Sequence, residues 1–230
     1  FLEAGGFPQR VLSGQEIVVS ELYENILYRD IIGRFNKNLI KPIKELSLHL
    51  LSNVSSDLSL RKLSDLADIK NLSTVKQIID AFENAFLFFT VNKFAYSTKK
   101  QIQNPKKIYC VDNGFATVLG FRFSENKGRL LENLVAIELK RQGKEIYYHK
   151  EKFECDFVIK EKLKVSDIIQ VCFTLTEDNK KREYGGLIEA MDIFKLKKGL
   201  ILTHDQDEEV TIEGKKIIIK PVWKWLLEKQ

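Results

Sequence analysis

Apolar residues in the first half of the chain recur every three or four positions, the spacing that predicts α-helices. A long helix is expected at residues 16–35, and shorter ones at 44–53, 60–67 and 74–86. Ser59 and Ser73 stand directly before the last two as expected N-caps. Two strand-like runs follow, at 88–97 and 107–111, joined by a polar basic loop at 98–106. Three helices followed by a hairpin predict a winged helix.

Near Glu125 the pattern changes from helical spacing to alternation. An amphipathic helix is expected at 128–142, strands at 145–150, 154–160 and 166–174, a helix at 183–194, and strands at 199–203 and 216–221. The run 166–174 is almost wholly apolar, which predicts a central strand. We therefore predict a mixed α+β or α/β chain. Its expected parts are a helical linker at 1–43, a winged helix at 44–120 and a restriction-endonuclease-like mixed-sheet domain at 121–230.

Composition limits the class of protein. The chain has 230 residues, of which 44% are hydrophobic and 30% charged, as in globular domains. It has no apolar run of the roughly 20 residues that cross a bilayer and no signal-peptide pattern, so no membrane partner is expected. Three widely spaced cysteines (Cys110, Cys155 and Cys172) predict reduced core thiols of a cytoplasmic protein. The chain begins with Phe1 and its one methionine is Met191, which suggests a start inside a longer protein.

Basic residues are concentrated in one segment of the chain. The net charge is +5, and residues 37–108 hold twelve basic and six acidic side chains. On the expected helix 74–86, the third of the winged-helix segment, Lys76 and Gln77 are expected to face outward, where they can read base edges in a DNA groove. The expected hairpin adds phosphate contacts at Lys99, Lys100, Lys106 and Lys107. The open alternative is a protein-docking or structural spacer, in which the lysines only solvate the hairpin.

Three oxygen-bearing side chains mark the second half. Glu132 lies on the expected helix, Asp156 in one apolar strand and Gln170 in the next. If the two strands pair with Asp156 opposite Gln170, these oxygens can share a hard cation such as Mg²⁺, which polarises a phosphate while a lysine orients or activates water. The alternative is structural: Glu132 pairs within the helix packing, and Asp156 and Gln170 satisfy buried backbone groups.

Several motifs together resemble a known family, the DUF 4143 C-terminal regions of prokaryotic AAA+ ATPases. They are Gly5-Gly6-Phe7-Pro8, Tyr28-Arg29-Asp30-Ile31, the string from Asn104 to Gly114, the string from Gly128 to Val135 and the string from Glu154 to Ile159. The resemblance implies an upstream P-loop ATPase domain, a winged helix and a domain of the PD-(D/E)XK nuclease type. In the nuclease-type domain, many relatives carry Glu-Val-Lys on the strand that follows the aspartate, where this chain has Gln170-Val171-Cys172.

Taken together, these features predict a DNA-associated region with a catalytically degenerate nuclease-like domain. The alternatives are a Mg²⁺-dependent DNA endonuclease and a docking or regulatory module that controls the upstream ATPase. Catalytic and metal candidates are Glu132, Asp156 and Gln170. Lys150 and Lys160 are the candidate substitutes for the missing lysine, but Lys160 lies roughly 13 Å along the strand from Asp156, which makes it a poor replacement. The chain has no Walker A loop of its own. DNA and the upstream ATPase domain are the expected partners, and a homo-oligomer is left open.

Overall fold

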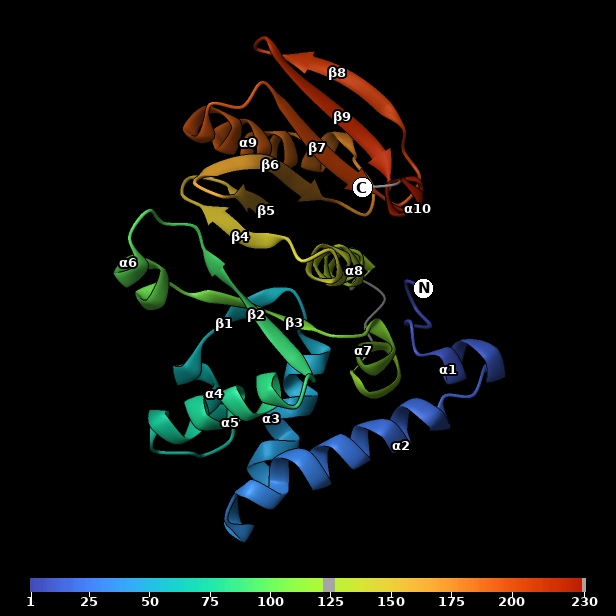
Figure 1. Cartoon of the computed structure of the whole chain (residues 1–230), viewed down its shortest axis with the longest axis vertical. Coiled ribbons are helices and arrows are strands. Elements are labelled where there is room, and N and C mark those ends of the chain that lie inside the picture. Colours follow the sequence, from blue (N-terminus) through green and yellow to red (C-terminus); the bar gives the residue numbers. More distant parts are fainter. Residues whose placement is uncertain (122–126, 229–230) are drawn as a thin grey trace. The chain divides into compact units, whose positions relative to one another are not determined.

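The computed structural model describes residues 1–121 and 127–228. It divides into two compact units, one formed by residues 1–90 and 105–126 and the other by 91–104 and 127–230. The chain contains both helices and strands, as predicted for a mixed α/β fold (Figure 1). No helix in the described ranges is long and apolar enough to cross a membrane.

The first unit is mainly helical. Its elements are the helices α1 (Pro8–Ser13), α2 (Ile17–Asn25), α3 (Ile40–Ser52), α4 (Leu60–Leu66), α5 (Leu72–Asn84) and α7 (Asn113–Leu119), the strands β1 (Ser56–Leu58) and β3 (Lys106–Cys110), and the first half of β2 (Phe88–Lys93). The helix α2 continues into a π-helical turn at Ile26–Ile31 and a 3₁₀ turn at Ile32–Arg34, and a further 3₁₀ turn, Lys37–Leu39, precedes α3. Strand β1 pairs antiparallel with β3. The winged helix itself stays a prediction.

Helix boundaries in this unit follow from their caps. The Ser59 hydroxyl accepts a hydrogen bond from the backbone N–H of Lys62, which confirms the predicted cap of α4. The predicted Ser73 cap of α5 is wrong, because the Asn71 side chain accepts from the backbone N–H of Ser73 and the helix starts two residues earlier. The buried face of α5 carries Val75, Ile78, Ile79 and Phe82 at the predicted helical spacing.

The second unit is a sheet covered by helices. Its elements are the helices α6 (Thr98–Gln103), α8 (Lys127–Arg141), α9 (Glu177–Phe194) and α10 (Val222–Leu227), and the strands β4 (Glu145–Lys150), β5 (Glu154–Glu161), β6 (Lys164–Val171), β7 (Lys198–Thr203), β8 (Glu208–Ile212) and β9 (Lys215–Pro221). The strand order is β4-β5-β6-β7-β9-β8, and the second half of β2 pairs parallel with β4. Residues 98–103, predicted as loop, form α6 instead.

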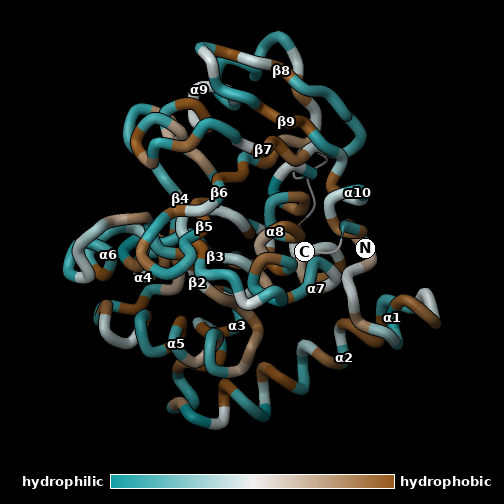
Figure 2. Tube along the Cα trace, turned by 45° about the horizontal axis from the view of Figure 1, so that its top comes forward, coloured by the Kyte–Doolittle hydropathy of each residue, from teal (hydrophilic) through white to brown (hydrophobic). Residues whose placement is uncertain are grey.

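This sheet is mixed in direction. Strands β4, β5 and β6 are antiparallel neighbours, whereas β6, β7 and β9 run parallel and β8 returns antiparallel to β9. Apolar residues occupy the middle of β7 and of β9 (Figure 2). Ile217 and Ile219 pack in one core with Leu187 and Met191 of α9. Ile218 instead lines a groove with Leu139 of α8 and Trp225 of α10, so helices cover both faces of the strand.

Candidate functional site

The hairpin of β5 and β6 brings Asp156 and Gln170 together. Phe157 pairs with Ile169, and the same antiparallel register puts Asp156 opposite Gln170. The backbone N–H of Asp156 donates to Oε1 of Gln170 at 3.3 Å, and Oδ2 of Asp156 accepts from the backbone N–H of Val171 at 2.9 Å. Both side chains are buried, with 5% and 6% of their residue surface exposed. Both side chains thus accept hydrogen bonds from buried backbone N–H groups, as the structural alternative to a metal site predicts for Asp156 and Gln170.

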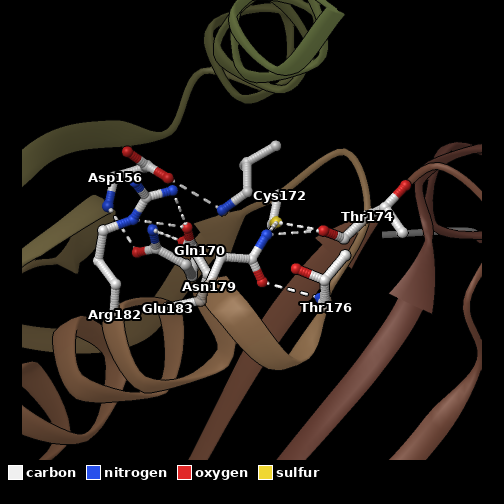
Figure 3. Close-up of polar contacts among 9 residues, drawn as sticks. Asp156, Gln170, Cys172, Thr174, Thr176, Asn179, Arg182 and Glu183 are labelled. Atoms are coloured by element: carbon white, nitrogen blue, oxygen red, sulfur yellow. Dashed lines mark hydrogen bonds and ion pairs between the residues drawn. The ribbon is translucent and has the colours of Figure 1, made fainter.

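The helix α9 adds an acid and a base that the sequence analysis missed. Nε2 of Gln170 donates to Oε2 of Glu183 at 2.7 Å. Nε and a terminal nitrogen of Arg182 donate to Oε1 of the same carboxylate, at 2.9 and 2.5 Å. Figure 3 shows Asp156, Gln170, Glu183 and Arg182 with their polar ends turned toward one another. We call these four residues the Asp156 cluster.

Arg182 and Glu183 differ in exposure. The Glu183 side chain is 3% exposed, whereas Arg182 is 75% exposed and extends its guanidinium over the buried carboxylate. Hydrogen bonding to Glu183 raises the pKa of Arg182, with smaller contributions from the charges on Glu183 and Asp156. The guanidinium therefore stays charged beside both acids. By formal charge, the two acids and the guanidinium together carry −1.

Cys172 lies at the edge of this cluster. Its thiol donates to the backbone oxygen of Thr174 at 3.1 Å, and the side-chain amide of Asn179 lies 3.5 Å from the sulfur. Burial raises the pKa of the thiol to about 11, and the negative charge of Glu183 acts in the same direction. The cysteine is thus a neutral thiol near pH 7, with no positive charge to offer a phosphate.

The other sequence candidates lie in different surroundings. Glu132 is buried on α8, with 9% of its surface exposed. The ammonium of Lys160 contacts both carboxylate oxygens of Glu145, at 2.9 and 3.0 Å, which agrees with the expectation that it is a poor replacement for the motif lysine at Asp156. Across residues 1–121 and 127–228, no three side chains of His, Cys, Asp or Glu come together in a way that could hold a metal ion.

The donor set of the Asp156 cluster has the right chemistry for Mg²⁺ but the wrong arrangement. Carboxylate and amide oxygens are the ligands that Mg²⁺ prefers. Both oxygens of Glu183, however, already accept hydrogen bonds from Gln170 and Arg182. As they stand, these residues do not form a magnesium site.

The expected nucleic-acid contacts divide into exposed and buried groups. Lys76 and Gln77 are exposed on α5 in the first unit, and Lys99 and Lys100 are exposed on α6 in the second. Lys106 is half-buried at the start of β3. Lys107 is only 3% exposed, because β3 turns it into the interior. Its predicted role as a phosphate contact is therefore wrong.

The cysteine prediction holds. Cys110, Cys155 and Cys172 are all free and buried, as expected for reduced core thiols.

The helix that carries Glu183 begins earlier than expected. It was predicted to begin at that residue but starts at Glu177, where the Thr176 and Asn179 side chains form a capping box. That box, Thr176 to Asn179, was the local sequence signal for the missed turn.

Comparison with known proteins gives the family. A model described as "Domain of unknown function (DUF8612)" matches residues 1–126, more than half of the chain. The chain belongs to this family. The expected membership of the DUF 4143 family is wrong, because the matching family is a different one and the relatives below are not named as ATPases. The inferred attachment to an upstream AAA+ domain loses its basis with it.

Two relatives of the DUF8612 chain come from an archaeon and a bacterium. An uncharacterised protein of Methanocaldococcus jannaschii is 34% identical over 246 aligned positions, which cover 99% of this chain and 54% of the relative. An uncharacterised protein of Haemophilus influenzae is 28% identical over 234 positions, covering 97% of this chain and 56% of the relative. The chain spans about half the length of the curated relatives it matches. No solved structure matches it.

Proposed function

We propose that this chain is a cytoplasmic, DNA-associated module whose nuclease-like centre does not cleave DNA efficiently by itself. The observation that carries the proposal is the Asp156 cluster. It joins an acid and an amide on paired strands to a second acid and a guanidinium from the covering helix. The element order around it is helix α8, strands β4, β5 and β6, helix α9 and strand β7.

Charge argues against efficient cleavage at this centre. Stabilising the charge that develops on a reacting phosphate is often the largest catalytic contribution. The cluster has a net charge of −1 when Arg182 is counted, so it repels a phosphodiester in the absence of an added cation. The neutral thiol of Cys172 does not change this balance. In this proposal the acids keep their places but the motif lysine is missing, because position 172 is a neutral cysteine.

DNA association in this proposal rests on exposed basic residues outside the cluster. Lys99 and Lys100 are exposed on α6 and make no ion pair within the described ranges. Lys76 and Gln77 are exposed on α5, a helix whose opposite face is buried in its unit. Lysines placed in this way neutralise phosphates and make the affinity depend on salt. Reading of base edges by Lys76 and Gln77 is the finer part of the proposal.

Binding is tested by a duplex DNA titration over a range of salt concentrations. Lys99→Ala with Lys100→Ala is expected to flatten the log–log salt dependence by roughly 0.9 per lost contact. The control is Lys152→Ala with Lys216→Ala, which removes two other exposed lysines of the same unit, of which Lys216 pairs with Glu209 at 2.8 Å. An unchanged salt slope in the first pair would favour the docking alternative over DNA association.

Cleavage is tested with a plasmid and a linear duplex in Mg²⁺ and in Mn²⁺. The natural chain is expected to cut feebly or not at all. Cys172→Lys is expected to gain activity, because it adds the missing charge next to the acids, and Asp156→Ala should remove that gain. Strong cleavage by the natural chain that disappears in Asp156→Ala would refute the proposal.

A second candidate, a Mg²⁺-dependent DNA endonuclease, is favoured by one feature. Arg182 holds a permanent positive charge close to Asp156 and Cys172, in the region that the motif lysine would occupy. In this alternative the Arg182 guanidinium binds the phosphate, which requires Glu183 to release its hydrogen bonds. Glu132, Asp156 and Gln170 would supply the oxygen ligands of Mg²⁺. Glu183→Gln tests this, because it keeps the shape and releases the guanidinium. Higher Mg²⁺-dependent cleavage in Glu183→Gln than in the natural chain would favour the endonuclease.

A further inference from the structure

An aromatic cleft of about 790 Å³ lies in the second unit, and none of its lining residues belongs to the Asp156 cluster. Four segments line it: the stretch from Phe94 to Gln101, the start of β4, the turn between β5 and β6, and the C-terminal end of α9. The volume falls within the range of about 300–1,000 Å³ that small-molecule sites span. The cleft is therefore large enough for a specific ligand.

The floor of the cleft is built from aromatic rings. The edge-to-face partners of Phe94 are Tyr147 at 5.4 Å, Phe194 at 4.9 Å and Tyr96 at 5.2 Å between ring centroids. Phe94 is thus fixed by three neighbours, whereas Tyr96 is 86% exposed. Because Tyr96 contacts Phe94 and is otherwise mostly exposed, its phenol ring offers a flat surface on which a base can stack.

The charges around the cleft are uneven. Glu145 is the one acid that lines it. Its carboxylate accepts from the Tyr147 hydroxyl at 2.6 Å and from Lys160 at 2.9 Å, and these bonds lower its pKa. Lys164 and Lys195 also line the cleft, are exposed, and form no ion pair within residues 1–121 and 127–228. With Glu145 balanced by Lys160, the rim has a positive charge of two.

We propose that this cleft binds unpaired nucleotides of a single-stranded nucleic acid, which deepens the proposed function and rests on it. A base stacks on Tyr96, and the phosphates on either side of it lie near Lys164 and Lys195. Every base has a π-face, so such stacking tolerates different sequences. In a duplex these faces are hidden by neighbouring bases. An acidic peptide would match the lysines but would leave the open ring unused.

The test uses the whole chain and the fluorescence anisotropy of a labelled short oligothymidine. Tyr96→Ala is expected to weaken binding about 5-fold to 100-fold, the usual effect of losing one stacked base. Tyr96→Phe keeps the ring and is expected to bind like the natural chain. Lys164→Ala with Lys195→Ala should flatten the salt dependence by roughly 0.7 per contact. The control is again Lys152→Ala with Lys216→Ala, which should leave single-strand binding in place.

Competitors identify the source of the ligand. Oligothymidine should compete better than a polymer of abasic sugar-phosphates, than polyglutamate and than thymidine monophosphate. Equal competition by polyglutamate or by the abasic polymer would mean that charge alone is recognised, and equal competition by the monophosphate would point to a free nucleotide. Either result overturns the single-strand assignment.

The outcomes separate this inference from the proposed function. Suppose that the natural chain binds duplex DNA, and that neither Tyr96→Ala nor Lys164→Ala with Lys195→Ala changes its binding of oligothymidine. This result overturns the proposed single-strand site in the cleft but leaves the proposed DNA-associated module in place. A natural chain that binds neither duplex nor single strand overturns both proposals. Loss of single-strand binding in Tyr96→Ala with retained duplex binding supports the cleft.

Discussion

Asp112 in the first unit and Asp156 in the second are both buried acids with different surroundings. Asp112 accepts the backbone N–H of Gly6 at 2.7 Å and that of Gly114 at 2.6 Å, one on each oxygen. It thereby caps α7 and ties the N-terminal segment to it. Asp156 also accepts a backbone N–H, but polar side chains from a neighbouring strand and from α9 gather around it.

This difference separates a structural acid from a candidate site. Backbone donors fix a carboxylate in place and leave it little capacity for a ligand. Side chains from several elements can change partners, which a functional centre needs. In the first unit, Asp112 joins the N-terminal segment to α7. In the second unit, the charged side chains of the Asp156 cluster meet where β5 and β6 pack against α9, and the candidate site lies there.

The largest effect is expected at Gly5. It has a φ of +75°, and a Cβ at this position would lie 1.9 Å from Oδ1 of Asp112 and 2.7 Å from the backbone nitrogen of Gly114. Gly5→Ala is therefore expected to lower the free energy of unfolding by about 3 kcal/mol or more, at the upper end for single substitutions. Urea unfolding of the whole chain measures it.

Gly14 supplies the matched control for Gly5. Its φ is +70°, but no atom lies within 4 Å of an added Cβ. Gly14→Ala should cost only about 1–2 kcal/mol, the strain of a left-handed residue with a side chain. Equal losses in the two variants would mean that the contact with Asp112 does not hold the N-terminal segment.

The second prediction concerns Asp112 itself. Asp112→Asn keeps one acceptor but turns an N–H group toward the second backbone donor, so the free energy of unfolding should fall by about 1–3 kcal/mol near pH 7. Burial raises the pKa of Asp112 in the folded chain. Its contribution to stability is therefore complete below the unfolded pKa of about 3.9 and declines as the pH rises through the folded pKa.

The stability difference between Asp112 and its Asn variant should accordingly shrink as the pH rises. Unfolding titrations of the natural chain and of Asp112→Asn at several pH values between about 3.5 and 7 measure this trend. A difference that does not change with pH, or that grows with it, would show that burial does not control this carboxyl.

The third prediction moves to the Asp156 cluster. Arg182→Ala leaves the buried carboxylate of Glu183 without its charged partner. Because Arg182 is mostly exposed, solvent screens the pair, and we expect a loss of about 1 kcal/mol in the free energy of unfolding. Arg141 and Glu138 form a similar pair, in which Glu138 is 12% exposed. Arg141→Ala should cost less, since its acid is better solvated, and a larger loss there would contradict this account.

The smallest effect is expected at Cys172. The charge of Glu183 is the second cause of its raised pKa, after burial. Glu183→Gln should therefore move the thiol pKa down from about 11 toward 9. The pH dependence of iodoacetamide labelling at Cys172, located by mass spectrometry, measures the shift, and Cys172→Ala gives the background. An unchanged pKa would indicate that burial alone sets it.

The sequence predicted the local part of the candidate site. Apolar runs identified β5 and β6, and the condition that they pair with Asp156 opposite Gln170 is met by the register of the structure. The mixed α/β class is confirmed, since periodicity and strand alternation are properties of short windows. Family membership was read wrongly, because short motifs in order are shared more widely than the family they suggested.

What the sequence determined by itself is the set of elements and the face each residue takes within its element. The tertiary structure decided which distant side chains meet. Glu183 and Arg182 look like ordinary charges on an amphipathic helix until α9 packs against β5 and β6. Lys107 looks like a solvated lysine until β3 places it in the interior. Local spacing depends only on backbone geometry, whereas burial and partnership depend on contacts between residues far apart in the chain, so a single sequence cannot give them.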